Sequence, residues 1–196
     1  MTKTRSLAIL LFDDAEVLDF CGPFEVFSVA NNQSESPAFN VYTVAEKSPI
    51  TACNGLSVNP DHTLKSCPKP NILLVPGGIG TRRELNNEAL IEWIGKVADE
   101  AELVLSVCTG ALLLGKAGLL DGLGTTTHHV AYDLLREIVP SCTVHEDQRF
   151  VDNGIVITSA GIAAGIDMSL HVVERLLGRD VASATARHME YPWEHQ

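Results

Sequence analysis

The sequence predicts an α/β fold in which a mainly parallel sheet carries helices on both faces. Short, continuous apolar runs recur along the chain, and such runs are typical of strands that are buried on both faces. Stretches with helical periodicity separate them, and strands that alternate with crossover helices form parallel sheets. With 196 residues, 45% of them hydrophobic, the chain can bury a sizeable core, so we expect one domain over residues 1–196.

The first half of the chain alternates clearly between the two patterns. Asn54-Gly55 lies between two short apolar runs and favours a hairpin turn. Asn87 precedes an amphipathic stretch and is a suitable N-cap. The expected elements are a strand at 6–12, a helix at 20–30, a loop at 31–39, a strand at 39–45, a hairpin at 50–59, a strand at 71–75 and a helix at 87–101.

The second half continues the alternation. Asn153-Gly154 favours a second hairpin, and Gly178 stands where a helix C-cap glycine belongs. The stretch before Gly178 places Ile166, Leu170 and Val173 on one helical face. The expected elements are a strand at 103–107, a helix after residue 108, a helix at 129–139, a hairpin at 149–161, a helix at 163–178 and a last helix at 180–189.

The net charge, the length of the apolar stretches and the spacing of the cysteines each disfavour some classes of function. The formal net charge of −11 disfavours binding to nucleic acid, because an acidic surface repels phosphate. No apolar stretch approaches the roughly 20 residues that span a bilayer, and acidic Asp13 and Asp14 follow the first apolar run at once, so we expect a cytoplasmic protein without membrane contact. The five cysteines form no C-x-x-C pair, so we expect neither a zinc site nor a dithiol redox motif.

One of these cysteines occupies a special place. Cys108 follows the apolar run 103–107 directly and precedes a helix, with Gly110 as a small neighbour. A thiol on such a strand-to-helix turn faces the positive end of the next helix, which lowers its pKa, and lies beside backbone N–H groups that hold an anion. Gly77-Gly78, after strand 71–75, offers further donors at the same sheet edge. The pattern therefore favours a cysteine nucleophile, and the alternative is an ordinary core cysteine.

Five motifs in order carry a resemblance to a known family. The chain resembles the DJ-1/PfpI superfamily, and within it the branch of isonitrile hydratases and of the amidotransferase-like domains of AraC-type regulators. The motifs are LDFCGP at 18–23, VPGG at 75–78, SVCTGALLLGKAGLLDG at 106–122, TTTHHVAYDLL at 125–135 and SAGIAAGIDMSL at 159–170. The resemblance implies a flavodoxin-like sheet, similar to class I glutamine amidotransferases, with a cysteine nucleophile elbow, and it implies a homodimer.

The resemblance also implies roles for individual residues. Cys108 matches the elbow cysteine, and Asp19 matches a carboxylate that hydrogen-bonds the cysteine sulfur; the alternative for Asp19 is a helix N-cap. Thr109 and Gly78 match the backbone donors of the oxyanion pocket. Thr109 stands where the peptidases of the superfamily carry histidine, so peptidase activity is not expected.

Four further residues complete the expected substrate pocket: Gly77, Gly110, His128 and Gly161. A histidine such as His128 is alternatively a hydrogen-bonded structural residue. The implied activity is hydration of an isonitrile to an N-substituted formamide, without metal or cofactor. Two alternatives remain open, a glyoxalase-like hydratase on the same turn and a non-enzymatic sensor in which Cys108 is oxidised or binds a small ligand.

Overall fold

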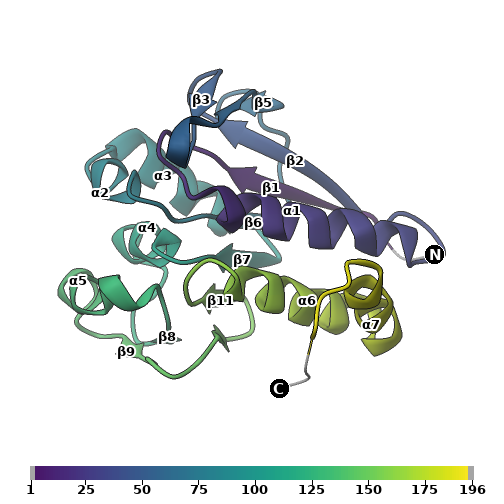
Figure 1. The fold of residues 1–196 in the computed structure, drawn as a ribbon. Coiled ribbons are helices and arrows are strands. Elements are labelled where there is room, and N and C mark those ends of the chain that lie inside the picture. Colours follow the sequence, from purple (N-terminus) through teal and green to yellow (C-terminus); the bar gives the residue numbers. More distant parts are fainter. Residues whose placement is uncertain (1–2, 194–196) are drawn as a thin grey trace.

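A computed structural model describes residues 3–193 and contains a central seven-stranded sheet (Figure 1). The strands lie in the order β10-β11-β7-β6-β1-β2-β5, and every neighbouring pair is parallel except β10 with β11. Their bounds are β1 Arg5–Leu10, β2 Phe39–Ala45, β5 His62–Thr63, β6 Ile72–Val75, β7 Leu103–Ser106, β10 Phe150–Asp152 and β11 Val156–Ser159. The predicted mainly parallel sheet is confirmed.

Helices flank the sheet in two groups. The helices α1, α6 and α7 pack on one another, whereas α4 contacts α2, α3 and α5 (Figure 1). The bounds are α1 Val17–Asn32, α2 Thr81–Glu84, α3 Glu88–Ala98, α4 Gly110–Lys116, α5 Tyr132–Ile138, α6 Ala164–Leu177 and α7 Arg179–His188. Two 3₁₀ turns, Cys53–Gly55 and His129–Ala131, and two small sheets, β3 Ile50–Thr51 with β4 Ser57–Val58 and β8 Gly124–Thr125 with β9 Thr143–Val144, complete the described structure.

The middle of the sheet forms the core and defines the functional edge. Every residue of β6 and β7 is buried, and so are the last four residues of β1. Val75, the last residue of β6, pairs with Ser106, the last residue of β7. The segments that follow these two strands therefore leave the sheet side by side, which brings the glycine loop at 76–80 to the turn at Cys108.

Most expected helices and strands are present, and they differ from the expectation mainly in the residues at which they begin and end. Both hairpins form, and Asn87 caps α3 by accepting a hydrogen bond from the Leu90 N–H group at 3.2 Å. Gly178 ends α6 with φ of 92°, as its position predicts. The first helix begins three residues before the expected start, at Val17, and continues to Asn32 into the expected loop. In the described part of the chain, no helix is both long and apolar enough to cross a membrane.

Candidate active site at the end of β7

The backbone of Cys108 forms the sharp turn that the sequence predicts. β7 ends at Ser106 and α4 begins at Gly110, and Cys108 between them has φ of 56°. This left-handed conformation is unfavourable for a residue with a Cβ atom, so the surrounding structure must hold it. The Cys108 N–H group donates to the carbonyl oxygen of Ala160 at 3.1 Å, which ties the turn to the end of β11.

The surroundings of the sulfur do not lower its pKa as the sequence predicts. Cys108 is only 4% exposed. Burial, followed by the negative charge of Asp19, raises the pKa of the thiol to about 12, and this outweighs the N–H groups of Thr109 and Ile162, which face the sulfur and lower the pKa. The expected lowering of the pKa by the helix is therefore wrong. At neutral pH the resting cysteine is a thiol and needs a base to become a nucleophile.

Asp19 is the group beside that thiol, and it is completely buried. It lies inside the first turn of α1, whose N-cap is Glu16, so the alternative reading of Asp19 as the N-cap is wrong. Its Oδ2 atom accepts a hydrogen bond from the Gly77 N–H group at 2.9 Å, and its Oδ1 atom has no partner of normal geometry among residues 3–193. Burial raises the pKa of Asp19 to about 7, although the Gly77 N–H group and the Cys108 thiol lower it.

The glycine pair after β6 has a different role from the expected one. The Gly77 N–H group is used by Asp19, and the Gly78 N–H group donates to the Thr109 hydroxyl at 3.0 Å. That hydroxyl donates in turn to the Gly78 carbonyl at 3.1 Å. Neither glycine N–H group is therefore free to hold an anion, because each positions a neighbouring side chain. The free donors at the sulfur are the N–H groups of Thr109 and Ile162, and sequence reasoning missed Ile162 because its φ of 50° is invisible in the sequence.

Two other predicted glycines are needed for close packing. A Cβ atom on Gly110 would lie 2.1 Å from the Val75 carbonyl oxygen, and the Gly110 N–H group already donates to the Val107 carbonyl. A Cβ atom on Gly161 would lie 2.2 Å from Cδ2 of His128. Gly110 therefore lets α4 approach β6, and Gly161 makes room for the His128 ring. Neither lines the pocket at Cys108, contrary to the expectation that they contact substrate.

A small open pocket of about 180 Å³ leads to Cys108. Three of the residues that line it, Ile79, Val130 and Ile162, have apolar side chains. Ile79 and Val130 are 66% and 65% exposed. The complete lining consists of Glu16, Gly78, Ile79, Arg82, Cys108, Thr109, His128, Val130 and Ile162. Residues from five segments of the chain thus meet here, and the pocket has room for a small molecule with an apolar substituent.

His128 reaches the pocket as expected. Burial lowers the pKa of its ring, and the nearby charges of His129 and Arg82 lower it further, so the ring is neutral at pH 7. The Val130 N–H group donates to its Nδ1 atom at 3.4 Å, and its ring lies against that of His129 with the centroids 4.3 Å apart. The neutral ring presents a polar edge to the pocket without adding charge.

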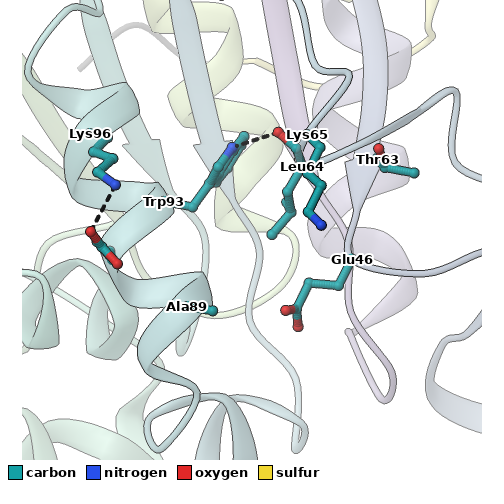
Figure 2. A pocket seen from close by; sticks show the side chains of 8 residues that line it. Glu46, Thr63, Leu64, Lys65, Ala89, Trp93 and Lys96 are labelled. Atoms are coloured by element: carbon teal, nitrogen blue, oxygen red, sulfur yellow. Dashed lines mark hydrogen bonds and ion pairs between the residues drawn. The ribbon is translucent and has the colours of Figure 1, made fainter.

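A larger hollow of about 630 Å³ lies elsewhere, between α3 and the edge of the sheet at β5 (Figure 2). Trp93 forms one wall and donates from Nε1 to the Leu64 carbonyl at 3.1 Å, and Lys96 pairs with Glu92 at 2.7 Å. None of the residues predicted to act in chemistry lines it. Among residues 3–193, no group of three or more potential metal-binding side chains occurs. The pocket at Cys108 is therefore the better candidate for the active site, although its volume is smaller.

Known proteins match this chain over most of its length. The model of the DJ-1/PfpI family matches residues 5–175. The isonitrile hydratase of Pseudomonas putida is 35% identical over 94% of this chain and 78% of its own length. The HTH-type transcriptional regulator CdhR of Pseudomonas aeruginosa is 33% identical over 88% of this chain, which spans about half (51%) of that regulator.

Solved structures repeat the same fold. A THiJ/PfpI family protein from Pseudomonas syringae superposes with a TM-score of 0.88 and 28% identity, over 99% of this chain and 78% of its own. DJ-1beta of Drosophila melanogaster superposes with a TM-score of 0.83 over 97% of this chain and 100% of its own, at 19% identity. At that identity, the second likeness concerns the fold alone.

Proposed function

Since the chain belongs to the DJ-1/PfpI family, we propose that it is a cysteine-dependent hydratase that converts isonitriles, R–N≡C, to N-substituted formamides. The observation that carries the proposal is the buried pair of Cys108 and Asp19, with an Asp19 pKa of about 7. A carboxyl group with this pKa can take and return a proton at neutral pH. The likeness to an isonitrile hydratase suggests the substrate class, since the family fold itself accommodates several functions.

The first step adds the Cys108 thiol across the terminal carbon of the isonitrile. Ionised Asp19 takes the thiol proton and delivers it to that carbon while the sulfur–carbon bond forms. The product is a thioimidate, Cys–S–CH=N–R, and Asp19 is ionised again. One oxygen of this buried carboxyl group, Oδ2, accepts the hydrogen bond from the Gly77 N–H group. The other, Oδ1, has no hydrogen-bond partner of normal geometry among the described residues and is therefore suited to this proton transfer.

The second step consumes water. Ionised Asp19 takes a proton from water while the oxygen bonds to the imidate carbon, and it passes that proton to the nitrogen. The tetrahedral adduct, Cys–S–CH(OH)–NH–R, then breaks its sulfur–carbon bond and loses its hydroxyl proton, which returns to the Cys108–Asp19 pair. The formamide R–NH–CHO leaves, and the pair again holds one proton. The N–H groups of Thr109 and Ile162 are placed to stabilise negative charge near the sulfur.

The pocket offers apolar surface for the substituent R of an isonitrile, beside the charged residues Glu16 and Arg82. Ile79, Val130 and Ile162 supply apolar surface around Cys108, and the neutral ring of His128 adds a polar edge. A redox sensor is less well supported, because the pKa of about 12 keeps the thiol protonated, whereas sensor cysteines react as thiolates.

The test is a substrate assay with purified protein. We expect formamide from simple alkyl and aryl isonitriles, detected by chromatography, and no formamide from Cys108→Ser. Methylglyoxal, assayed beside the isonitriles, tests the alternative of a glyoxalase-like hydratase on the same cysteine. Absence of Cys108-dependent formamide from every isonitrile would contradict the proposal.

A further inference from the structure

The carbonyl group of Cys108 accepts a hydrogen bond from a residue with no assigned role. The Thr127 hydroxyl donates to the Cys108 carbonyl oxygen at 2.7 Å, and both residues are buried. We find no backbone N–H group among residues 3–193 that donates to this carbonyl. Since a buried carbonyl group requires a partner, the Thr127 hydroxyl meets a need of the turn itself.

This bond acts where the backbone is strained. Cys108 has φ of 56°, and a Cβ atom makes that conformation unfavourable. Two hydrogen bonds hold the residue, one on each side of its Cα atom. Its N–H group donates to Ala160, and its carbonyl accepts from Thr127. Loss of the second bond frees the peptide that follows Cys108 to rotate, and the sulfur direction changes with it.

The two residues before Thr127 are hydrogen-bonded to β11. The preceding N–H group, that of Thr126, donates to the hydroxyl oxygen of Thr158 on β11 at 2.9 Å, and the Thr125 hydroxyl donates to the same oxygen at 3.2 Å. The next residue, His128, lines the pocket. Thr127 therefore connects a buried, hydrogen-bonded segment on one side with the pocket wall on the other.

We propose that Thr127 is a positioning residue, which holds Cys108 in the left-handed turn that directs its sulfur into the pocket. The inference rests on the proposed role of Cys108 as the nucleophile. Thr127 is not one of the residues that line the pocket, and its hydroxyl reaches Cys108 through the backbone carbonyl.

The neighbouring residue offers a matched control. Thr126 is also completely buried, but its Oγ1 atom has no hydrogen-bond partner among the described residues. Thr126→Val therefore replaces a buried hydroxyl group with a methyl group, as Thr127→Val does at the next position, but it breaks no hydrogen bond of that hydroxyl. Replacing an unpaired buried hydroxyl with a methyl group costs little or stabilises the protein.

The experiment compares Thr127→Val with Thr126→Val and Thr127→Ser. For isonitrile hydration we expect Thr127→Val to lower kcat/KM by about 10–100-fold, mainly through kcat, because the nucleophile is misplaced. Thr127→Ser keeps the hydroxyl donor and should remain within about threefold of the unmodified protein, as should Thr126→Val. Equal losses in Thr127→Val and Thr126→Val, or no recovery in Thr127→Ser, would overturn the proposal.

A second measurement does not depend on the substrate. The rate of Cys108 alkylation by iodoacetamide, followed by peptide mass spectrometry, should fall about tenfold in Thr127→Val, because the displaced sulfur loses the N–H donors that stabilise its thiolate. If that variant does not fold, Thr127→Ala and Thr127→Ser provide the same comparison and differ only in the hydroxyl. A rate in the alanine variant equal to or above that in the serine variant refutes the role of Thr127. A protein that hydrates no isonitrile, yet shows the tenfold difference, refutes the proposed function alone.

Discussion

Asp19→Asn should make the protein more stable and nearly inactive at the same time. Asparagine has almost the same shape as aspartate, and its amide oxygen can accept the hydrogen bond that Oδ2 of Asp19 receives from the Gly77 N–H group at 2.9 Å. The variant removes the buried charge and the proton carrier but keeps this contact. Its effects on stability and on turnover therefore have opposite signs.

The magnitude follows from the pKa of Asp19, which rises to about 7 in the folded protein. An exposed aspartate in the unfolded chain has a pKa of about 4. Between these two values the folded state binds more protons, so its free energy of unfolding falls as the pH rises from about 4 to about 7. Three pKa units correspond to about 4 kcal/mol, and Asp19→Asn should recover up to that amount above pH 7 and almost none of it below pH 4.

The assay is urea unfolding of both proteins between pH 4 and pH 8, with isonitrile turnover measured at neutral pH. We expect the stability difference to grow with pH and kcat to fall about 10²–10⁴-fold, which is the usual loss when a general acid–base group is removed. Asp19→Glu, which keeps the carboxyl group, should recover part of the activity. A stability difference that stays constant with pH refutes the raised pKa, and near-normal turnover in Asp19→Asn refutes the proton transfer.

Three further predictions test other parts of the structure. Isonitrile kcat/KM should decline as the pH is lowered below about 7, because protonated Asp19 cannot accept the thiol proton; a pH-rate profile without this acidic limb contradicts the mechanism. Gly110→Ala should cost about 3 kcal/mol or more, because its Cβ atom would lie 2.1 Å from a β6 carbonyl oxygen, whereas Gly95→Ala, in open space on α3, should stabilise by about 0.4–1 kcal/mol in thermal unfolding. The protein should be a homodimer, with the half-exposed Leu18 and Phe24 of α1 in the interface, and light scattering that reports only the 21.1 kDa monomer excludes it.

The segments that form the candidate site could be predicted from the sequence, because the end of a strand is a local feature. The apolar runs before Gly77 and before Cys108 mark β6 and β7, and parallel strands end at one edge of the sheet. The turn at Cys108 needed only the strand before it, the helix after it and the small residue Gly110. The family motifs added Asp19, whose carboxyl group does lie beside the sulfur.

The thiol pKa and the free N–H donors of the site could not be predicted from the sequence. The helix after Cys108 predicts a lowered thiol pKa, but the burial of the sulfur and the charge of Asp19 reverse the direction. The glycine motif predicts two free N–H donors, but Asp19 and Thr109 occupy them. In each case the deciding partner is a side chain or a degree of burial that the local pattern does not contain.

The sequence by itself determined the alternation of strands and helices, both hairpin turns and the position of Cys108 on a strand-to-helix turn, because each depends on periodicity or on turn residues within a few positions. Only the tertiary structure decided which groups carry protons and which donors are free. The bond from Gly77 to Asp19 joins residues 58 positions apart, and the bond from Thr127 to Cys108 spans 19. Such contacts, and the loss of water that raises both pKa values, exist only when the packed chain brings distant segments together.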